Sequence, residues 1–321
     1  MNKKTKKYLI IILVVLSLLG TYLLCQTLLI NSRKEQDVVE KEKRYIENQA
    51  KERVMDTINS TLEYFKEVDT TDYQEYAYEE ELEYSKLTKD QKVIYDSMLM
   101  NVLDFKYFKY EASKVGYDTL DDVLISYGAL KLDHPEVEIY FYLNEVVDED
   151  TTTALEAVYY MPGDISLEKA DIVKLKEEIK IFNEEINLII SSMPGNLNTY
   201  DKYRYLATYI SLRTTYDNDF KNGNQTINIY GAISSKTSIC EGYAKAFKYL
   251  CKKANLWCDL VDGTSNGTSH MWNLVKLNDE YYHVDITWSD NQDVAPNSLE
   301  WFNYFMVSED KILLDHEITR M

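Results

Sequence analysis

The sequence contains few cysteines, and none of them forms a Cys-x-x-Cys pair. The 321 residues include 4 cysteines, which are Cys25, Cys240, Cys251 and Cys258. Structural zinc sites usually take their ligands in closely spaced pairs, so a zinc site made from the last three cysteines and His270 is disfavoured. The acidic stretches also lack the glycine-punctuated loop that binds calcium. No metal and no cofactor is therefore predicted.

Positive charge is also scarce. The chain has 35 Lys and Arg against 54 Asp and Glu, which gives a net charge of -19. Such a surface does not neutralise phosphates, so nucleic acid is not an expected partner. An acidic, soluble surface outside a cell is compatible with this charge. The 28 tyrosines are interpreted mainly as core and surface packing, with a polymer-binding face as the alternative.

Hydrophobic residues make up 45% of the chain, which is enough for a folded core. The length allows an anchor followed by two modest domains. Residues 2–7 are rich in lysine, and no charged residue occurs from Tyr8 to Ile30. A helix of this length crosses the hydrocarbon core of a bilayer, which is about 30 Å thick. We therefore predict that residues 1–30 form a cytoplasmic tail and a transmembrane anchor.

Two alternatives to the anchor are disfavoured. A cleaved signal peptide has a shorter apolar region and a small-x-small cleavage site, which is absent here. The residue before Cys25 is a leucine, whereas lipoprotein signals resemble a pattern with a small residue there. More basic residues precede the span than follow it at Arg33 and Lys34, so the N-terminus is expected in the cytoplasm and the rest outside.

Residues 31–86 are interpreted as a helical stalk and linker. The sequence from 31 to about 65 is dense in charged residues with sparse apolar positions, and it runs as a helix into the next domain. The alternative makes this stretch simply the first helix of that domain. The acidic, tyrosine-rich residues 67–83 are expected to form a solvated connector.

Residues 87–196 are predicted to form an N-terminal extension with helices and a hairpin. Thr88 and Gln91 match a capping box, which starts a helix to about residue 106. His134 lies beside a proline and is expected to be a turn or capping residue. The remaining predicted elements are helices at 120–130, 167–192 and 199–213 and paired strands at 137–147 and 154–161.

Cys240 precedes a strongly helix-forming run over residues 243–250. It therefore lies in or near the first helical turn, where free N–H groups and the helix dipole favour a thiolate. Thr237 or Ser238 is expected near the N-cap, and Gly242 is expected to keep side-chain bulk away from the sulfur. The alternative for Cys240 is an inert cysteine at an ordinary helix start.

Cys251 and Cys258 are interpreted as buried and inert. Cys251 falls inside the predicted helix, and Cys258 falls in an apolar run. The three cysteines after residue 30 are an odd number, so at least one has no partner among them. A bond between Cys251 and Cys258 is left open.

A predicted hairpin follows the helix. The predicted strands cover 256–262, 270–277 and 281–287, and a turn joins the last two at 278–280. If the strands pair around residue 278, His270 lies opposite about residue 286 and next to Asp285. The order Cys240, His270 and Asp285 is then that of a thiol nucleophile, its base and the group that orients the base. His283 is the rival base, with its partner expected near Asn273.

Four segments together resemble the transglutaminase-like superfamily. These segments are Tyr230–Ile233, Ile239–Ala246, His270–Val275 and Tyr282–Trp288. The resemblance covers about residues 201–290 and implies an α+β, papain-like fold in which a nucleophile helix packs on an antiparallel sheet. Residues 197–321 would be this catalytic domain, with Cys240, His270 and Asp285 as its triad. Arylamine N-acetyltransferases share the triad order, but their arginine- and glycine-rich approach to the cysteine is absent.

Residues 87–216 further resemble the extension of bacterial membrane-anchored members. The family implies thiolate attack on an amide of a protein or peptide, with a thioester intermediate, as in a cysteine protease or a transglutaminase-type acyltransferase. The sequence leaves open whether water or an amine resolves the thioester. Two other hypotheses are an inactive binding or scaffold protein on the same fold and a metal-binding domain.

The sequence also suggests which residues surround the predicted triad. The backbone N–H of Cys240 is the expected oxyanion donor, with Tyr230 as the candidate for a second. Trp272 and Trp288 are expected either to line a substrate groove or to fill the core.

Overall fold

The computed structural model describes the backbone of residues 3–68, 71–78, 82–164, 166–290 and 294–320. Side chains in these ranges are described from residue 34 onward except at 117, 118 and 224, and also at 28, 31 and 32. The chain divides into two units, residues 1–49 and 50–321. The predicted boundaries at 86 and 196 both fall inside the second unit and stay predictions.

Helix α1 spans Lys3–Leu62, and a 3-10 turn, η1, follows at Glu63–Phe65. The helix predicted for residues 31–65 is therefore confirmed. Its last part belongs to the second unit, where Val54 and Ile58 are fully buried. Within the described residues, no helix combines the length and the apolar character needed to cross a membrane. The side chains of the predicted anchor, 8–30, lie almost entirely outside the described part, so the anchor stays a prediction.

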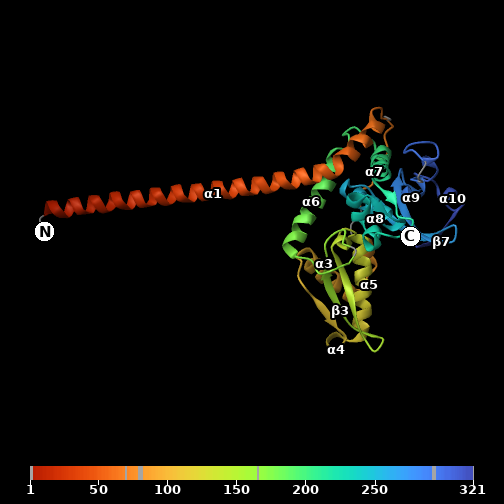
Figure 1. Cartoon of the computed structure of the whole chain (residues 1–321), viewed down its shortest axis with the longest axis horizontal. Helices are drawn as coiled ribbons and strands as arrows, with labels where there is room; N and C mark the ends of the chain where they lie inside the picture. Colours follow the sequence, from red (N-terminus) through yellow and green to blue (C-terminus); the bar gives the residue numbers. More distant parts are fainter. Residues whose placement is uncertain (1–2, 69–70, 79–81, 165, 291–293, 321) are drawn as a thin grey trace. The chain divides into compact units, whose positions relative to one another are not determined.

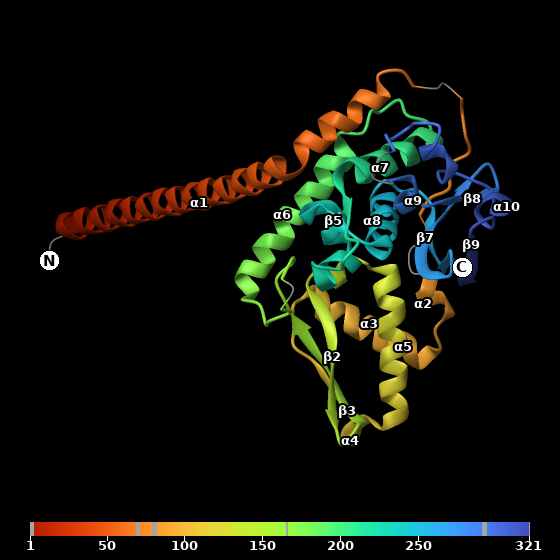
Figure 2. The ribbon, with the colours of Figure 1, turned by 45° about the vertical axis from the view of Figure 1, so that its right-hand side comes forward.

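The extension consists of helices packed beside a small antiparallel sheet of order β1-β3-β2 (Figures 1 and 2). Its elements are α2 (Leu82–Lys86), α3 (Lys89–Leu103), β1 (Lys109–Glu111), α4 (Ala112–Val115), α5 (Tyr117–Asp133), η2 (Val137–Ile139), β2 (Phe141–Asp148) and β3 (Thr151–Tyr159). The capping box is confirmed, because Thr88 accepts from the N–H of Gln91 and the Gln91 side chain accepts from the N–H of Thr88. The predicted hairpin is also confirmed, with Phe141 opposite Tyr159.

Two long helices connect the extension to the core. Helix α6 covers Ile172–Ser191, and so begins later than the predicted residue 167, whereas α7 covers Thr199–Arg213 as predicted. Asp171 caps α6 and Asn198 caps α7, each with a side-chain oxygen that accepts backbone N–H groups. The apolar side chains of α7 are buried, so this helix fills the space next to the nucleophile helix.

The core places helix α8, Cys240–Lys253, against a four-stranded antiparallel sheet of order β8-β7-β6-β9 (Figure 2). The α+β class and the packing of a helix that begins at Cys240 on an antiparallel sheet are therefore as predicted. The strands are β6 (Cys258–Ser265), β7 (Thr268–Leu277), β8 (Glu280–Val284) and β9 (His316–Arg320). Asn273 on β7 donates to the carbonyl of Ala244 at 2.9 Å, which ties the sheet to α8.

Short elements complete the core. They are β4 (Thr215–Tyr216), η3 (Gly223–Ile227), η4 (Gly231–Ser235), β5 (Thr237–Ser238), α9 (Ile286–Ser289), η5 (Trp301–Asn303) and α10 (Glu309–Ile312). β4 and β5 form a parallel pair just before α8. This pair fixes the chain that leads into the nucleophile helix.

Two lysines of α8 are buried and paired with carboxylates. Lys248 bonds Asp259 at 2.9 Å, and Lys245 bonds both Glu241 and Glu138. Burial alone lowers the pKa of Lys245, but the two glutamates raise it overall. A buried ion pair that loses one partner leaves an uncompensated charge. The ion pair between Lys245 and Glu138 therefore joins α8 of the core to the extension, and the loss of either residue would leave a buried charge unpaired.

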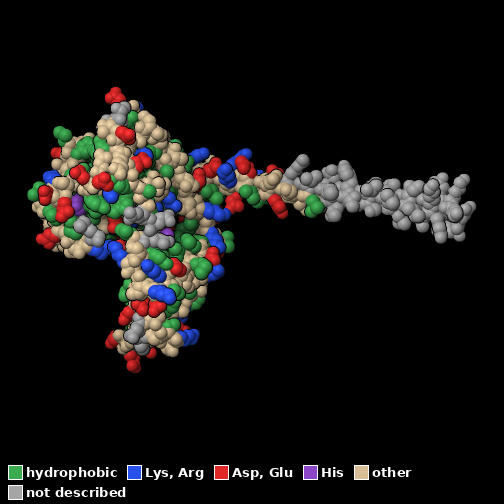
Figure 3. Space-filling model, turned by 180° about the vertical axis from the view of Figure 1, so that it is seen from behind, with side chains coloured by type: hydrophobic (Ala, Val, Ile, Leu, Met, Phe, Trp, Pro, Cys, Tyr) green, Lys and Arg blue, Asp and Glu red, His purple; other side chains and the backbone are tan. Residues whose placement is uncertain are grey.

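The described residues 71–78 of the connector are exposed or half-buried, as expected, and they contact the core at several points. The described residues 71–78 lie along the β7–β8 turn, where the N–H of Gln74 donates to Asn278 at 2.9 Å. The N–H of Trp257 donates to the carbonyl of Tyr76 at 2.9 Å. The ammonium of Lys276 lies 4.1 Å from the centre of the Tyr76 ring. Tyr76 is thus half-buried against the core, within a connector that stays in contact with solvent. Figure 3 shows acidic and basic side chains interspersed on the face of residues 50–321 that it displays.

Candidate active site

Cys240 is the first residue of α8 and is half-buried. The N-cap is Ile239, which has no side-chain capping bond. Thr237 and Ser238 lie directly before this cap, near the position expected, but neither side chain caps the helix. Ser238 instead donates to the carbonyl of Thr226 at 2.8 Å, because β5 holds it against the preceding segment. The first-turn N–H groups next to the sulfur are therefore not occupied by a capping side chain.

Gly242 is required by close packing at the helix start. A Cβ at this position would lie 2.1 Å from Ser238 Oγ and 2.5 Å from the carbonyl oxygen of Thr226. A larger residue would push α8 away from the segment that fixes it. The glycine thus positions Cys240 through the backbone, a reason that differs from the one the sequence suggested.

His270 lies near the start of β7, opposite Gly263 of β6. Its Nε2 lies 2.7 Å from Asp285 Oδ2, and the ring also interacts with the Cys240 thiol. Since Nε2 is bonded to the carboxylate, Nδ1 is the ring nitrogen left for the thiol. Burial lowers the pKa of His270, but the Asp285 carboxylate and the contact with Cys240 raise it to about 10. His270 is therefore an imidazolium at neutral pH.

Asp285 lies beyond the end of a strand, which corrects the predicted register. The ladder between β7 and β8 runs from Leu277–Glu280 to Asn273–Val284, so residues 285–287 do not continue it. Asp285 is the N-cap of α9, and its Oδ1 accepts from the N–H of Trp288 at 3.1 Å. The cap leaves Oδ2 free for His270. The adjacency predicted for His270 and Asp285 holds, but helix capping produces it.

His316, on β9, completes the cluster and was not identified from the sequence. Its Nε2 lies 3.1 Å from Asp285 Oδ2, and its Nδ1 lies 2.6 Å from Asp315 Oδ1. Asp285 is fully buried; burial raises its pKa, but His270 and His316 lower it overall. The one available signal was Gly263, where a Cβ would lie 2.0 Å from the carbonyl oxygen of Glu317 and would keep β9 away.

His283, the rival base, lies in a different environment. It pairs with Leu274, one residue from the expected position, and its Nδ1 accepts from Trp272 Nε1 at 2.9 Å. Burial and the nearby His316 lower the pKa of His283 to about 4. The structure brings His270, and not His283, to Asp285 and Cys240.

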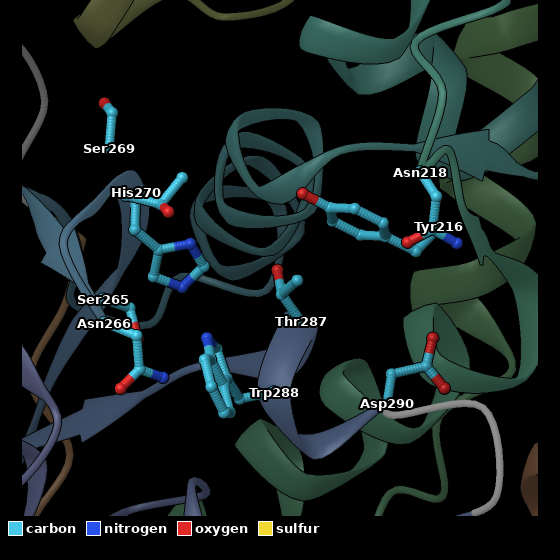
Figure 4. Close-up of a pocket in the computed structure, with 10 residues that line it drawn as sticks. Tyr216, Asn218, Ser265, Asn266, Ser269, His270, Thr287, Trp288 and Asp290 are labelled. Atoms are coloured by element: carbon cyan, nitrogen blue, oxygen red, sulfur yellow. The ribbon is translucent and has the colours of Figure 1, made fainter.

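A pocket of about 540 Å³ opens at this cluster (Figure 4). Its lining residues are Tyr216, Asn218, Ser265, Asn266, Thr268, Ser269, His270, Thr287, Trp288 and Asp290. Trp288 thus lines the pocket, whereas Trp272 is buried and its ring stacks on His270. Tyr230 does not reach the pocket, because its hydroxyl donates to Glu178 at 3.1 Å. Tyr230 is therefore wrong as a candidate oxyanion donor.

One group of described residues has the spacing of metal ligands. One ligand atom each of His270, Asp285 and His316 lies within 4.8 Å of the others. These atoms already bond one another through Asp285 Oδ2, so a cation would displace those bonds. Cys251 and Cys258 are buried free thiols. The cysteine-based zinc site is not among the ligand groups found in the described part of the chain.

Comparison with known proteins agrees with the motifs. Residues 189–286, which include all three proposed triad residues, match the family model described as the transglutaminase-like superfamily. This segment is therefore similar to that superfamily, which is the resemblance that the sequence predicted. No curated protein matches the chain.

Two solved structures are similar at low identity. One is a crystal structure of a TGase, with 15% identity and a TM-score of 0.32 over 50% of this chain and 46% of the other. The second is a protein from Cytophaga hutchinsonii proposed to be a cysteine protease, with 13% identity and a TM-score of 0.29 over 46% of this chain and 62% of the other. The chain thus spans less than two thirds of either protein. Similarity at this level does not bear on the chemistry of the site.

Proposed function

We propose that the protein is a thiol enzyme that attacks amide bonds of protein or peptide substrates through Cys240, His270 and Asp285. The observation that carries this proposal is the buried 2.7 Å bond between His270 and Asp285 beside a half-buried cysteine at a helix start. A thiolate beside an imidazolium is an activated nucleophile. Asp285 fixes the ring and stabilises its positive charge.

The chemical steps follow from these positions. The Cys240 sulfur attacks the amide carbonyl, a C–S bond forms, and the carbonyl oxygen becomes an oxyanion. His270 gives its Nδ1 proton to the leaving amine as the C–N bond breaks, which leaves a thioester. Water or a second amine then attacks the thioester while His270 accepts its proton, and the cysteine is released. The first acceptor gives a hydrolase and the second a transamidase.

The proposal includes an anchor. Residues 8–30 are uncharged and lysines precede them, which supports a single transmembrane helix with the N-terminus in the cytoplasm. The catalytic domain would then lie outside the membrane and act on extracellular protein or cell-wall peptide. Labelling of intact cells with a reagent that does not cross the membrane checks this orientation, and a domain that stays unlabelled until lysis would contradict it.

Alkylation kinetics test the nucleophile. Iodoacetamide should modify Cys240 of the full-length protein at least about tenfold faster than in His270→Asn, because the imidazolium stabilises the thiolate. His283→Asn is the matched control and should react like the wild type. Equal rates in the wild type and His270→Asn would exclude an activated pair.

Amide chemistry is tested with casein as the acyl donor. Release of ammonia or new amino termini should require Cys240, and an added fluorescent primary amine should become incorporated if the enzyme is a transamidase. A Cys240→Ala variant that keeps its full biological effect would instead support a scaffold on this fold.

A further inference from the structure

The start of α8 supplies one oxyanion donor, the Cys240 N–H, and leaves the second to be found. An oxyanion that forms on the substrate is usually stabilised by two preorganised donors. Tyr230, the candidate from the sequence, is bonded to Glu178 away from the pocket. A second donor would therefore have to come from another residue near the Cys240 sulfur.

Tyr216 is held next to the nucleophile by its backbone. It belongs to β4, which pairs in parallel with β5, and it lies opposite Ser238, two residues before Cys240. The following residue, Asp217, donates its N–H to the carbonyl of Ser238 at 2.8 Å. The position of Tyr216 relative to the start of α8 is thus fixed by main-chain bonds and does not depend on a mobile side chain.

The Tyr216 side chain reaches into the site. Its ring packs near that of Tyr243 on α8, with ring centres 6.4 Å apart. The hydroxyl lies beside both the thiol and the backbone N–H of Cys240. Figure 4 shows the Tyr216 hydroxyl and the His270 ring facing the same space from opposite sides. A carbonyl carbon attacked by Cys240 would place its oxygen in this space, on the side of Tyr216.

The surroundings keep this hydroxyl protonated. Burial raises the pKa of Tyr216, and the neighbouring Cys240 thiolate raises it as well, although the Cys240 N–H opposes this. A phenol with a raised pKa retains its proton at neutral pH. It can therefore donate a hydrogen bond to a negatively charged oxygen.

We propose that the Tyr216 hydroxyl is the second oxyanion donor and acts with the Cys240 N–H on the tetrahedral intermediate. The hydroxyl only donates a hydrogen bond; its proton stays on the phenol, and the leaving amine receives its proton from His270. This inference rests on the proposed function, since it assigns a catalytic group to the same acyl transfer.

Two reagents that attack the same sulfur test the proposal without a known substrate. p-Nitrophenyl acetate acylates Cys240 through a tetrahedral intermediate that carries an oxyanion. Iodoacetamide alkylates it by displacement, and no oxyanion forms. In full-length Tyr216→Phe, the ratio of the acylation rate to the alkylation rate should fall about tenfold or more, since removal of one oxyanion donor costs about 100-fold or more in other enzymes.

Tyr243→Phe is the matched control. Its hydroxyl is also buried near the site, but it bonds Asp290 at 2.8 Å and the carbonyl of Thr214 at 3.1 Å. Its rate ratio should stay within about twofold of the wild type, because it removes a hydroxyl that does not face the oxyanion. The alkylation rate of each variant shows whether the pocket is folded.

Three outcomes would overturn the inference. An unchanged ratio in Tyr216→Phe would show that the hydroxyl does not stabilise the oxyanion. A raised ratio would show that Tyr216 blocks the oxyanion position. Equal losses in Tyr216→Phe and Tyr243→Phe would assign the effect to packing. If wild-type Cys240 is acylated no faster than in His270→Asn, the proposed function itself fails, which is a separate result.

Discussion

Two histidines on neighbouring strands lie in opposite electrostatic environments. His270, on β7, faces the Asp285 carboxylate, and its pKa is raised to about 10 despite burial. His283, on β8, accepts from the Trp272 N–H, and burial lowers its pKa to about 4. Both side chains are almost fully buried. Desolvation disfavours the charged form of both rings, so the partner at the ring nitrogen decides which one carries a proton.

This difference in protonation lets two histidines on neighbouring strands of one small sheet serve different purposes. A ring that holds a proton beside a thiol can give it to a leaving amine, and a neutral ring bonded to a tryptophan can only support the packing. Trp272 contacts both rings, with centres at 5.8 Å from His270 and 6.2 Å from His283. Trp272 therefore borders both histidines. A mutation at the partner of one ring can change the pKa of that ring and leave the pKa of the other unchanged.

The largest effect is expected from removing the carboxylate. Asp285→Asn keeps the shape but takes away the negative charge that holds His270 and His316, so kcat/KM for amide cleavage should fall about 10³- to 10⁴-fold. The pKa of His270 should fall toward that of His283, which NMR titration of the ring protons measures. Asp315→Asn is the control, because the Asp315 carboxylate bonds His316 and the Tyr304 hydroxyl and has no bond to His270 or Asp285. A loss of less than tenfold in Asp285→Asn would contradict the role of Asp285.

A smaller loss is expected at His316. His316→Gln removes an imidazole from Asp285 Oδ2, and a hydrogen bond to a charged group contributes about 1.5–3 kcal/mol, or roughly tenfold to a hundredfold in rate. The loss should appear in kcat more than in KM, because His316 positions Asp285 and does not line the pocket. Steady-state kinetics separate the two constants. An effect confined to KM would instead indicate a role in binding.

His283 should affect acid stability and hardly affect rate. Its pKa in the folded chain is about 4, below the ordinary 6.5, so the folded state binds fewer protons and loses stability as pH falls from about 6.5 through 4. His283→Gln should flatten this loss, seen as a smaller shift of the urea midpoint between pH 7.5 and 4.5. A variant as acid-sensitive as the wild type would show that other groups cause the loss.

The smallest effect, on the stability of the fold, is expected at Asp290. This residue extends the comparison of buried groups from histidines to carboxylates. It has no imidazole partner, and burial raises its pKa to about 7 although the Tyr243 hydroxyl bond opposes this. The contribution of Asp290 to the stability of the fold is then fully present below its ordinary pKa of 3.8. This contribution is lost as the pH rises through 7. The Asp290→Asn variant should therefore gain more stability relative to the wild type at pH 8 than at pH 4, as measured by urea unfolding at both pH values. No difference between the two pH values would show that Asp290 ionises freely.

The sequence predicted the elements of this fold well and their junctions less well. The capping box at Thr88, the helix that starts at Cys240 and the hairpin around residue 278 depend on local patterns, and local patterns are visible in a sequence. The end of β8 was missed because Asp285 satisfies a helix cap, which competes with strand pairing for the same backbone. The contacts of residues 71–78 with the core were not predicted, because their partners lie some 200 positions away in the chain, as at Asn278.

What the sequence predicted by itself is the proposed chemistry: a cysteine at a helix start, a histidine and an aspartate in a known order, and an apolar, lysine-flanked segment that predicts an anchor. Only the tertiary structure decided which groups tune that chemistry. His316 comes to Asp285 from the C-terminal strand, and Tyr216 comes to Cys240 through a two-residue parallel pair. The reason is physical: charge stabilisation depends on distances of about 3 Å between atoms, and such distances arise from packing of segments that are remote in sequence.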